Sequence, residues 1–283
     1  MKHFLSFFLL IFACSAALAG PSTTVIPYYG ERFYSLLRNG HSDEVKRELE
    51  IILRGTHQPT PNGLDEIGSG CSKSGCYQHT PINYTQARML LMGQLHLVET
   101  DRNEKAIQDV YCNRPRTANE LGEIPGSGRL PSDKIINVEH TWPQSKFSQF
   151  FPKEMQKTDL HHLFPTDSEI NAIRGNHNFG EVQRDLLQLK CRDSRFGISN
   201  DKNEKVFEPP HVHKGNAARA LMYFSVKYSM EIPPHVETVL RKWHHEDPVD
   251  AAEQERNQKI YAIQKSRNPF VDYPELVSII SDF

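Results

Sequence analysis

Residues 137–180 concentrate side chains whose types and spacing could carry out hydrolysis. They include four of the chain's 14 histidines and the adjacent pair Glu139 and His140. A neutral imidazole at His140 can remove a proton from water near neutral pH. A hard divalent cation such as Mg²⁺ prefers oxygen ligands, which Glu139 and the amide of Asn171 can supply. The stretch therefore predicts hydrolysis of a phosphodiester, with metal stabilising charge on the pentacovalent phosphate.

Two extended segments are expected to carry these groups. Ile135–Thr141 has the pattern of a strand, and Asp159–Phe164 has the pattern of a second one that ends at Pro165. Adjacent residues of a regular strand point to opposite faces. Glu139 and His140 can therefore share one site only if the first strand breaks or bulges at His140, and we expect such an irregularity there.

A short helix should follow the second segment. Thr166 and Glu169 have the spacing of a capping box, and Gly175 can end the helix after about two turns. On such a helix Asn171 and Arg174 are three residues apart and share one side. The predicted unit is a ββα arrangement in which both approach the Glu-His pair. Arg174 is then the candidate to clamp a phosphate oxygen.

Further polar residues are candidates for supporting the site or binding substrate. His161 and His162 would face opposite sides of a strand, so His162 is preferred for the site and the other is a candidate for a buried, hydrogen-bonded histidine. Arg116 lies in a loop, where solvated charge is the alternative to phosphate contact. Arg219 lies in an apolar helix, where a structural ion pair is the alternative. Asn178 completes this set.

The first nineteen residues have the parts of a secretory signal peptide: a basic start, an apolar run and a small-residue site that predicts cleavage after Ala19. A lipoprotein modified at Cys14 is the alternative, which bulky Phe12 disfavours. No other window is apolar over the roughly eighteen residues that a membrane helix needs. We expect the mature protein to be periplasmic or secreted, monomeric and without membrane contact.

Four cysteines lie beyond the predicted cleavage site: Cys71, Cys76, Cys112 and Cys191. In an oxidising compartment an even number favours two disulfides over a zinc site, for which the spacing lacks a second close pair. Of the three possible pairings, proximity favours Cys71 with Cys76. That leaves Cys112 with Cys191 to close a loop around the site, and it would make the enzyme sensitive to reductant.

The composition is that of an ordinary globular protein, with 38% hydrophobic and 24% charged residues. The net charge of −2 provides no global basic field for a polyanion, so positive charge must be local or come from metal. Helices are expected at 84–98 and, after a cap at Asn216, at 217–228, with a short strand at 109–112. We predict an α+β fold, a mainly helical scaffold around a small antiparallel sheet, forming one catalytic domain at 20–283.

Six segments carry a resemblance to known proteins: VEHTWPQSKF, DLHHLFPTDSEINAIRGNHNFGEV, ARMLLMGQLHL, DVYC, KGNAARALMYFSVKY and RNPFVDYPEL. They look like the bacterial endonuclease I family, which comprises secreted or periplasmic nucleases of the ββα-metal (His-Me finger) class. The resemblance implies Mg²⁺-dependent, sequence-tolerant cleavage of DNA, and often RNA, to 5′-phosphate ends, with Mn²⁺ or Ca²⁺ able to replace Mg²⁺ in binding. Carried over by motif, Glu139 and Asn171 match the metal ligands and His140 matches the general base.

The chain departs from some members of that family between the two strands. Those members have a longer insertion with an Arg that supports the scissile phosphate, whereas this segment offers only Lys146, Lys153 and Lys157. Arg174 is the expected substitute. Members with the short HTWPQSKF form are described as ribonucleases, so RNA preference is one alternative. A phosphoesterase for small substrates and a non-catalytic nucleic-acid-binding protein are two others.

Overall fold

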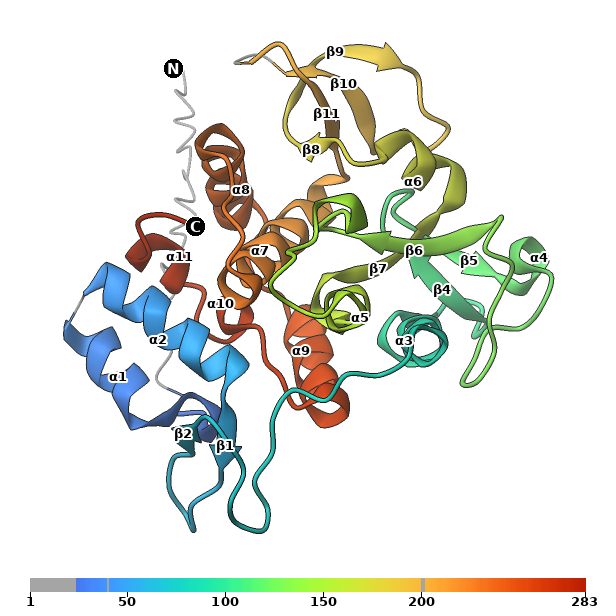
Figure 1. Cartoon of the computed structure of the whole chain (residues 1–283). Coiled ribbons are helices and arrows are strands. Elements are labelled where there is room, and N and C mark those ends of the chain that lie inside the picture. The colour runs from blue at the N-terminus through green and yellow to red at the C-terminus, as the bar shows by residue number, and fades with distance from the viewer. Residues whose placement is uncertain (1–23, 40, 200–201) are drawn as a thin grey trace, which may run out of the picture.

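The computed structural model describes residues 24–39, 41–199 and 202–283, so the predicted signal peptide lies outside the described residues. The main helices are α1 (Gly30–Asn39), α2 (Ser42–Arg54), α3 (Tyr84–Leu90), α4 (Ala118–Leu121), α5 (Lys153–Lys157), α6 (Ser168–Arg174), α7 (His211–Tyr228), α8 (Pro234–Glu246), α9 (Ala251–Gln264), α10 (Pro269–Asp272) and α11 (Leu276–Ile279). The strands are β1 (Thr56–Gln58), β2 (Glu66–Gly68), β3 (Leu97–Glu99), β4 (Lys105–Asp109), β5 (Arg114–Thr117), β6 (Ile136–His140), β7 (Leu163–Asp167), β8 (Asn178–Phe179), β9 (Val182–Leu187), β10 (Arg195–Ser199) and β11 (Lys205–Glu208). This is the predicted α+β fold (Figure 1).

The strands form four small sheets. Three are purely antiparallel, with the orders β1-β2, β3-β4-β5 and β6-β7, and the fourth has the order β8-β11-β10-β9 with β8 parallel to β11. In Figure 1 the β6-β7 hairpin lies at the centre, between the β8–β11 sheet and helices α3 and α9. The predicted small antiparallel sheet is therefore present as several separate ones.

Helix α7 forms the centre of the larger hydrophobic core. Nearly every side chain along it is buried, as expected of a helix in a protein interior. That core includes Tyr28 and Phe283, so both ends of the described chain contribute to it. The helix begins at His211, earlier than the predicted start after Asn216. Gly215 lies inside this helix. A side chain is excluded at this position because a Cβ would lie 1.9 Å from the carbonyl oxygen of Asp247, at the end of α8.

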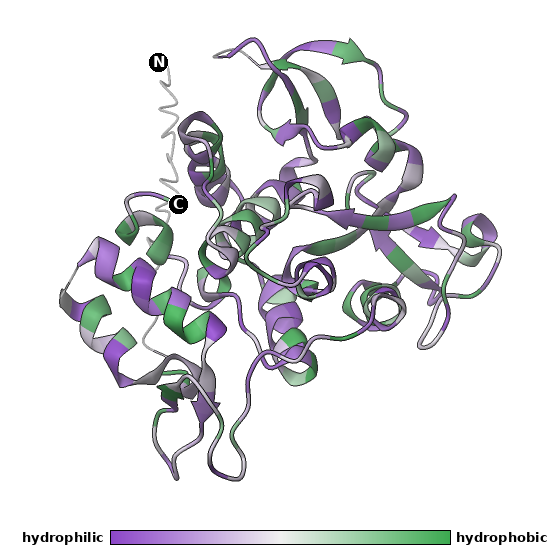
Figure 2. Ribbon diagram, in the orientation of Figure 1, coloured by the Kyte–Doolittle hydropathy of each residue, from purple (hydrophilic) through white to green (hydrophobic). Residues whose placement is uncertain are grey.

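The β6-β7 hairpin is buried on both faces. Phe164 belongs to the larger core, whereas Val138 and Leu163 belong to a smaller core built with α3 and α9. Figure 2 shows hydrophobic and hydrophilic residues interspersed along these central strands. Because neither face of the hairpin is open to water, its polar residues are shielded from solvent.

Pairing between consecutive strands explains why several elements differ from the predicted ones. The helix predicted at 84–98 ends at Leu95, after a π-helical turn, because Leu97–Glu99 pairs with β4. The strand predicted at 109–112 is β4, Lys105–Asp109, because residues 105–109 lie between β3 and β5 and pair with both. Strand formation here depends on the pairing of each segment with its neighbour, which the pattern of one segment alone does not reveal.

The second strand of the hairpin also lies later than predicted. Residues Leu160–His162 form a 3₁₀ turn, and β7 covers Leu163–Asp167, so Pro165 lies within the strand. Pro165 is opposite Val138, between the hydrogen-bonded pairs of the antiparallel ladder, where its missing N–H costs no ladder bond. Its carbonyl oxygen accepts a bond from Val110 N at 3.0 Å.

The cap of α6 differs by one residue from the prediction. Asp167, rather than Thr166, is the N-cap, and its carboxylate accepts hydrogen bonds from the N–H groups of Glu169 and Ile170 at 3.0 and 3.2 Å. Thr166 stays in β7 because it pairs with Asn137. The predicted end at Gly175 is confirmed, with a positive φ of 54° that glycine adopts without strain.

Buried histidines should make folding sensitive to acid, and His213 on α7 is a clear case. Burial lowers its pKa to about 3, and the guanidinium groups of Arg256 and Arg219 act in the same direction. Below about pH 6.5 the unfolded chain therefore binds a proton there that the folded chain does not, so stability falls as pH falls, by about 1.4 kcal/mol per pH unit. His213→Leu should reduce the slope of unfolding free energy against pH by about one proton, measured by urea unfolding between about pH 7 and pH 5. Val212→Ala, an exposed change on the same helix that removes no titratable group, should leave the slope unchanged.

Candidate active site

Glu139 and His140 are the last two residues of β6, and their side chains point to opposite faces. Pairing with β7 is regular through both residues and continues as a hydrogen bond of 3.0 Å from Thr141 N to the carbonyl oxygen of His162. The predicted break or bulge at His140 is therefore wrong, because the ladder holds the strand to its end. The Glu139 side chain faces Arg174, whereas the His140 ring lies on the opposite face of the strand.

The contacts of His140 define which ring nitrogen can act as a base. Its Nε2 lies 3.1 Å from the carbonyl oxygen of Lys157, which can only accept a hydrogen bond. The proton is therefore on Nε2, and the lone pair is on Nδ1. Nδ1 lies 3.3 Å from the amide nitrogen of Gln144. Burial lowers the pKa of His140 to about 3, and neighbouring His162 acts in the same direction, which favours the neutral ring.

Glu139 is held by a buried ion pair with Arg174. Its carboxyl oxygen Oε1 lies 2.9 Å from the guanidinium of Arg174, but without the alignment of a hydrogen bond, so the oxygen keeps acceptor capacity. Glu139 is 1% exposed. Burial raises the pKa of its carboxyl group, and the positive charge of Arg174 opposes that rise.

Arg174 lies beneath the end of β6. It donates to the carbonyl oxygens of His140 and Thr141 at 3.1 and 2.7 Å, and its own side chain is 2% exposed. Helical periodicity predicts that the side chains of Arg174 and Asn171 leave the helix on the same side. The guanidinium at the end of the Arg174 side chain, however, turns toward the protein interior. These contacts make Arg174 a support for Glu139 and the strand end, and they do not favour contact with a phosphate. Its predicted role as a phosphate clamp stays a prediction without support from these contacts.

Asn171 approaches the strand from α6. Its amide nitrogen donates to Oδ1 of Asn137 at 2.8 Å and to the carbonyl oxygen of Val138 at 3.1 Å. Asn137 and Glu139 are two residues apart on β6 and share a face, so Asn171 lies on the Glu139 side. Within the described ranges its Oδ1 accepts no hydrogen bond. Asn137 was missed by sequence reasoning, although alternation along the strand could have identified it.

The side-chain oxygens of Glu139 and Asn171 are suitable ligands for a hard divalent cation. A carboxylate oxygen with spare acceptor capacity and an amide oxygen lie on the same side of β6, and both are oxygen ligands that Mg²⁺ prefers. Mg²⁺ usually takes only one or two protein ligands and keeps several waters. The pair Glu139 and Asn171 is therefore sufficient in kind and number.

The two adjacent histidines of the 3₁₀ turn have different surroundings. His162 lies with its ring centre 5.5 Å from that of His140, and its Nε2 is 2.7 Å from the carbonyl oxygen of Gln156. His161 instead has its Nε2 3.1 Å from the carbonyl oxygen of Ser266 and packs on Tyr223. His162 is thus the neighbour of the candidate base, and His161 is a buried, hydrogen-bonded residue away from it.

The remaining polar candidates lie in structural contacts. Arg116 is buried between the carboxylates of Asp109 and Asp167, at 2.9 and 2.6 Å. Arg219 is fully buried, and its guanidinium donates to both oxygens of Glu253 at 2.8 and 2.6 Å. In both cases the geometry favours an ion pair over phosphate contact.

Asn178 lies on β8, close to the end of β6. Its Oδ1 accepts a hydrogen bond of 2.9 Å from Nζ of Lys146, which follows the first strand. Burial lowers the pKa of Lys146, and the positive charge of Arg174 lowers it further. Asn178 therefore holds one of the three lysines of the inter-strand segment in a defined position.

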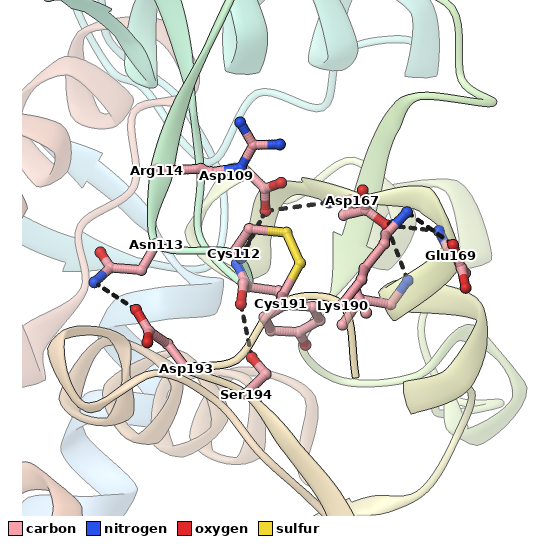
Figure 3. Close-up of a disulfide and its surroundings, with 12 residues drawn as sticks. Asp109, Cys112, Asn113, Arg114, Asp167, Glu169, Lys190, Cys191, Asp193 and Ser194 are labelled. Carbon is pink, nitrogen blue, oxygen red and sulfur yellow. Dashed lines mark hydrogen bonds and ion pairs between the residues drawn. A yellow bond between two sulfur atoms is a disulfide. The ribbon is translucent and has the colours of Figure 1, made fainter. Parts of the chain in front are cut away.

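Both predicted disulfides are present. Cys71 is bonded to Cys76 and Cys112 to Cys191, so the predicted pairing is confirmed and no thiolate of these four is left for zinc. Figure 3 shows the Cys112–Cys191 bond beside Asp167, the N-cap of α6, which also lies 2.9 Å from Nζ of Lys190. This bond therefore braces the loop that holds the start of the Asn171 helix.

Removing the Cys112–Cys191 bond should cost more stability than removing the other bond. The first closes a loop of 79 residues and the second a loop of 5. Loop entropy predicts losses of about 4.5 and about 2 kcal/mol, respectively. Unfolding of the Cys112→Ala/Cys191→Ala and Cys71→Ala/Cys76→Ala variants measures both. We also expect excess reductant to lower catalytic activity, and equal losses in the two variants or full activity in reductant would contradict this account.

The chain is similar in sequence to several known proteins. The family described as Endonuclease I matches residues 73–275. An extracellular ribonuclease of Bacillus subtilis (strain 168) is 31% identical over 218 residues, which is 70% of this chain and 68% of that protein. A periplasmic deoxyribonuclease of Aeromonas hydrophila is 30% identical over 115 residues, 40% of this chain and 47% of that protein. Endonuclease-1 of Buchnera aphidicola subsp. Baizongia pistaciae (strain Bp) is 30% identical over 159 residues, 55% of this chain and 64% of that protein.

Proposed function

Because the chain belongs to the endonuclease I family, we propose that it is a Mg²⁺-dependent endonuclease that acts outside the cytoplasm. It would hydrolyse phosphodiester bonds of DNA and RNA with little sequence specificity and leave 5′-phosphate ends. The observation that carries this proposal is the end of β6. There a neutral His140 with its lone pair on Nδ1 is the next residue after Glu139, which shares its side of the strand with Asn171.

In the proposed reaction His140 Nδ1 accepts a proton from the attacking water, whose oxygen forms the new bond to phosphorus. The O3′–P bond breaks, the 3′-oxygen leaves and takes a proton from solvent water, and His140 then returns its proton to the solvent. The carbonyl oxygen of Lys157, 3.1 Å from Nε2, keeps the ring oriented and stabilises its charge as it becomes protonated. Glu139 and Asn171 would hold the cation, which when bound supplies charge stabilisation at the phosphate and the leaving oxygen. Arg174 fixes Glu139 for this role.

The scissile phosphate is placed at the end of the strand in this proposal. Glu139 and His140 face opposite sides of β6, and the strand ends at His140. Only beyond that end can one ligand approach side chains from both faces. The regular ladder and the shared site are then compatible without a bulge.

A preference for RNA is the second candidate, and one observation favours it. The match to the extracellular ribonuclease covers 70% of this chain, whereas the match to the periplasmic deoxyribonuclease covers 40%. The same relatives are named as extracellular or periplasmic, and the two disulfides are consistent with an oxidising compartment. Among the described helices, none has the length and apolar character to cross a membrane.

Digestion of matched single-stranded DNA, duplex DNA and RNA, each with Mg²⁺ and with EDTA, tests this function. Cleavage of nucleic acid that EDTA abolishes is the expected result, and relative rates on the three substrates give the preference. Parallel reactions with Mn²⁺ or Ca²⁺ compare the cations. Absence of cleavage of every nucleic acid, combined with hydrolysis of bis-p-nitrophenyl phosphate, would replace the proposal with a phosphoesterase for small substrates.

A further inference from the structure

The proposed reaction lacks a cation that contacts the substrate phosphate from the protein. The arginines considered for this role, Arg116, Arg174 and Arg219, are buried against carboxylates or carbonyl oxygens. We propose that Lys157 and Tyr84 form a phosphate-binding subsite beside His140, in which the Lys157 ammonium and the Tyr84 hydroxyl contact a backbone phosphate of the substrate. This inference rests on the proposed nuclease function and adds the group that binds the polyanion.

Lys157 is linked to the candidate base through its own backbone. Its carbonyl oxygen lies 3.1 Å from Nε2 of His140, so the backbone of Lys157 contacts the ring of the candidate base. A substitution of the Lys157 side chain leaves this carbonyl in place, so it changes the cation and keeps the orientation of the base.

The ammonium of Lys157 is held in place by a neutral group. Its Nζ lies 4.3 Å from the centre of the Tyr84 ring, a cation–π contact. The nearest carboxylate oxygen belongs to Glu154, at 3.9 Å, on a side chain that is 70% exposed and therefore screened by water. An aromatic ring positions a positive charge without neutralising it. The charge of Lys157 thus stays available to a phosphate, unlike the charges of the three arginines.

The Tyr84 ring lies next to both the Lys157 ammonium and the ring of His140, the candidate base. Its ring lies 5.9 Å from the His140 ring, with 29° between the planes. In the described part of the chain its hydroxyl and Lys157 Nζ form no hydrogen bond to protein. Both side chains are partly exposed: Lys157 keeps 25% of its side-chain surface. A hydroxyl and an ammonium that keep free hydrogen-bond donors, next to a candidate general base, are the groups that a phosphate oxygen requires.

Two other lysines of the same segment fit the role less well. Lys153 lies one turn earlier on α5, exposed and without a described contact to the His140 ring. Lys146 donates to Asn178 at 2.9 Å, and its charge is near Arg174, on the Glu139 side of the strand. They provide a matched control and a direct competitor for Lys157.

The test compares Lys157→Gln, Lys157→Arg, Lys153→Gln and Lys146→Gln in Mg²⁺-dependent cleavage of one RNA and one DNA oligonucleotide. Lys157→Gln should lower kcat/KM by about 10²-fold, the effect of removing one donor to a transition-state oxygen. Lys157→Arg should restore most of the activity, and Lys153→Gln should behave as wild type. Tyr84→Phe should lose part of the activity through the hydroxyl, and Tyr84→Leu should lose more because the ring no longer holds the ammonium. Unfolding midpoints of the variants exclude a folding defect as the cause.

Binding gives an independent readout. In a His140→Ala background without metal, the affinity for a single-stranded oligonucleotide should fall with salt, and Lys157→Gln should reduce the slope of log K against log salt by about 0.7, the value for one phosphate contact on a single strand. A wild-type slope and wild-type kcat/KM in Lys157→Gln would overturn the subsite. A loss confined to Lys146→Gln would overturn it in favour of the other side of the strand. If the wild-type protein cleaves no nucleic acid, the proposed function fails and the subsite with it.

Discussion

Replacing His140 with alanine is expected to lower the single-turnover rate of Mg²⁺-dependent nucleic-acid cleavage by about 10²–10⁴-fold, the typical contribution of a general base. The reason is geometric: Nε2 is occupied by the Lys157 carbonyl, so Nδ1 is the proton acceptor, and alanine removes it. Substrate affinity should be nearly unchanged, because this ring contributes a proton acceptor rather than charge. Rates and oligonucleotide binding measured on the same preparation test both parts.

His211→Ala is a matched control, since it removes an exposed histidine that is the first residue of α7. It should keep the wild-type rate. Equal losses in the two variants would show that the effect is not specific to His140. Unchanged cleavage by His140→Ala would instead point to another base, while a wild type that binds nucleic acid and never cleaves it would favour the non-catalytic alternative.

Glu139→Gln should lose both stability and activity, for two separable reasons. Glu139 and Arg174 are each about 2% exposed at the side chain, 2.9 Å apart, and neutralising the carboxylate leaves a buried guanidinium unpaired. Breaking a buried pair in this way typically costs about 3–5 kcal/mol. Activity should fall because the proposed cation loses its charged ligand. Urea unfolding and cleavage assays at saturating Mg²⁺ measure the two effects.

The double variant Glu139→Gln/Arg174→Met separates the two roles. Removing both charges leaves no unpaired ion, so stability should return toward that of the wild type. Activity should stay low, because the ligand is still missing. If Arg174 were the phosphate clamp, Arg174→Met alone would lower activity and the salt dependence of binding while leaving stability intact. A large stability loss in that single variant is the result expected here.

The candidate residues of the site could be selected from the sequence because their signals are local. A Glu-His pair, an Asn on a short helix and a glycine that ends it are all read within about forty residues of the chain, and each has a short-range mechanism. Cysteine pairing was predictable for a different reason. Once Cys71 and Cys76 pair by proximity, only Cys112 and Cys191 remain.

Supporting residues were less predictable because their roles depend on contacts between distant parts of the chain. Periodicity fixes the direction in which the Arg174 side chain leaves the helix, but not where its long, flexible end makes contacts. The guanidinium turns inward because three acceptors lie there: Glu139 and the carbonyl oxygens of His140 and Thr141. Tyr84, 56 positions before His140, could be placed beside it only by folding.

The sequence alone determined the mixed α+β class and the disulfide pairing, and it predicted a nuclease whose candidate base and two candidate ligands remain proposals. These features depend on residue type and short spacing. Tertiary structure decided where β7 begins, that the strand does not bulge at His140, and which cations are paired with buried carboxylates. A strand's register and a charge's partner depend on the whole core, because pairing and desolvation are set by residues far away in the chain. For this reason we propose Lys157 rather than Arg174 as the phosphate-binding residue. Arg174 is buried, whereas the aromatic ring of Tyr84 holds the Lys157 ammonium beside the candidate base.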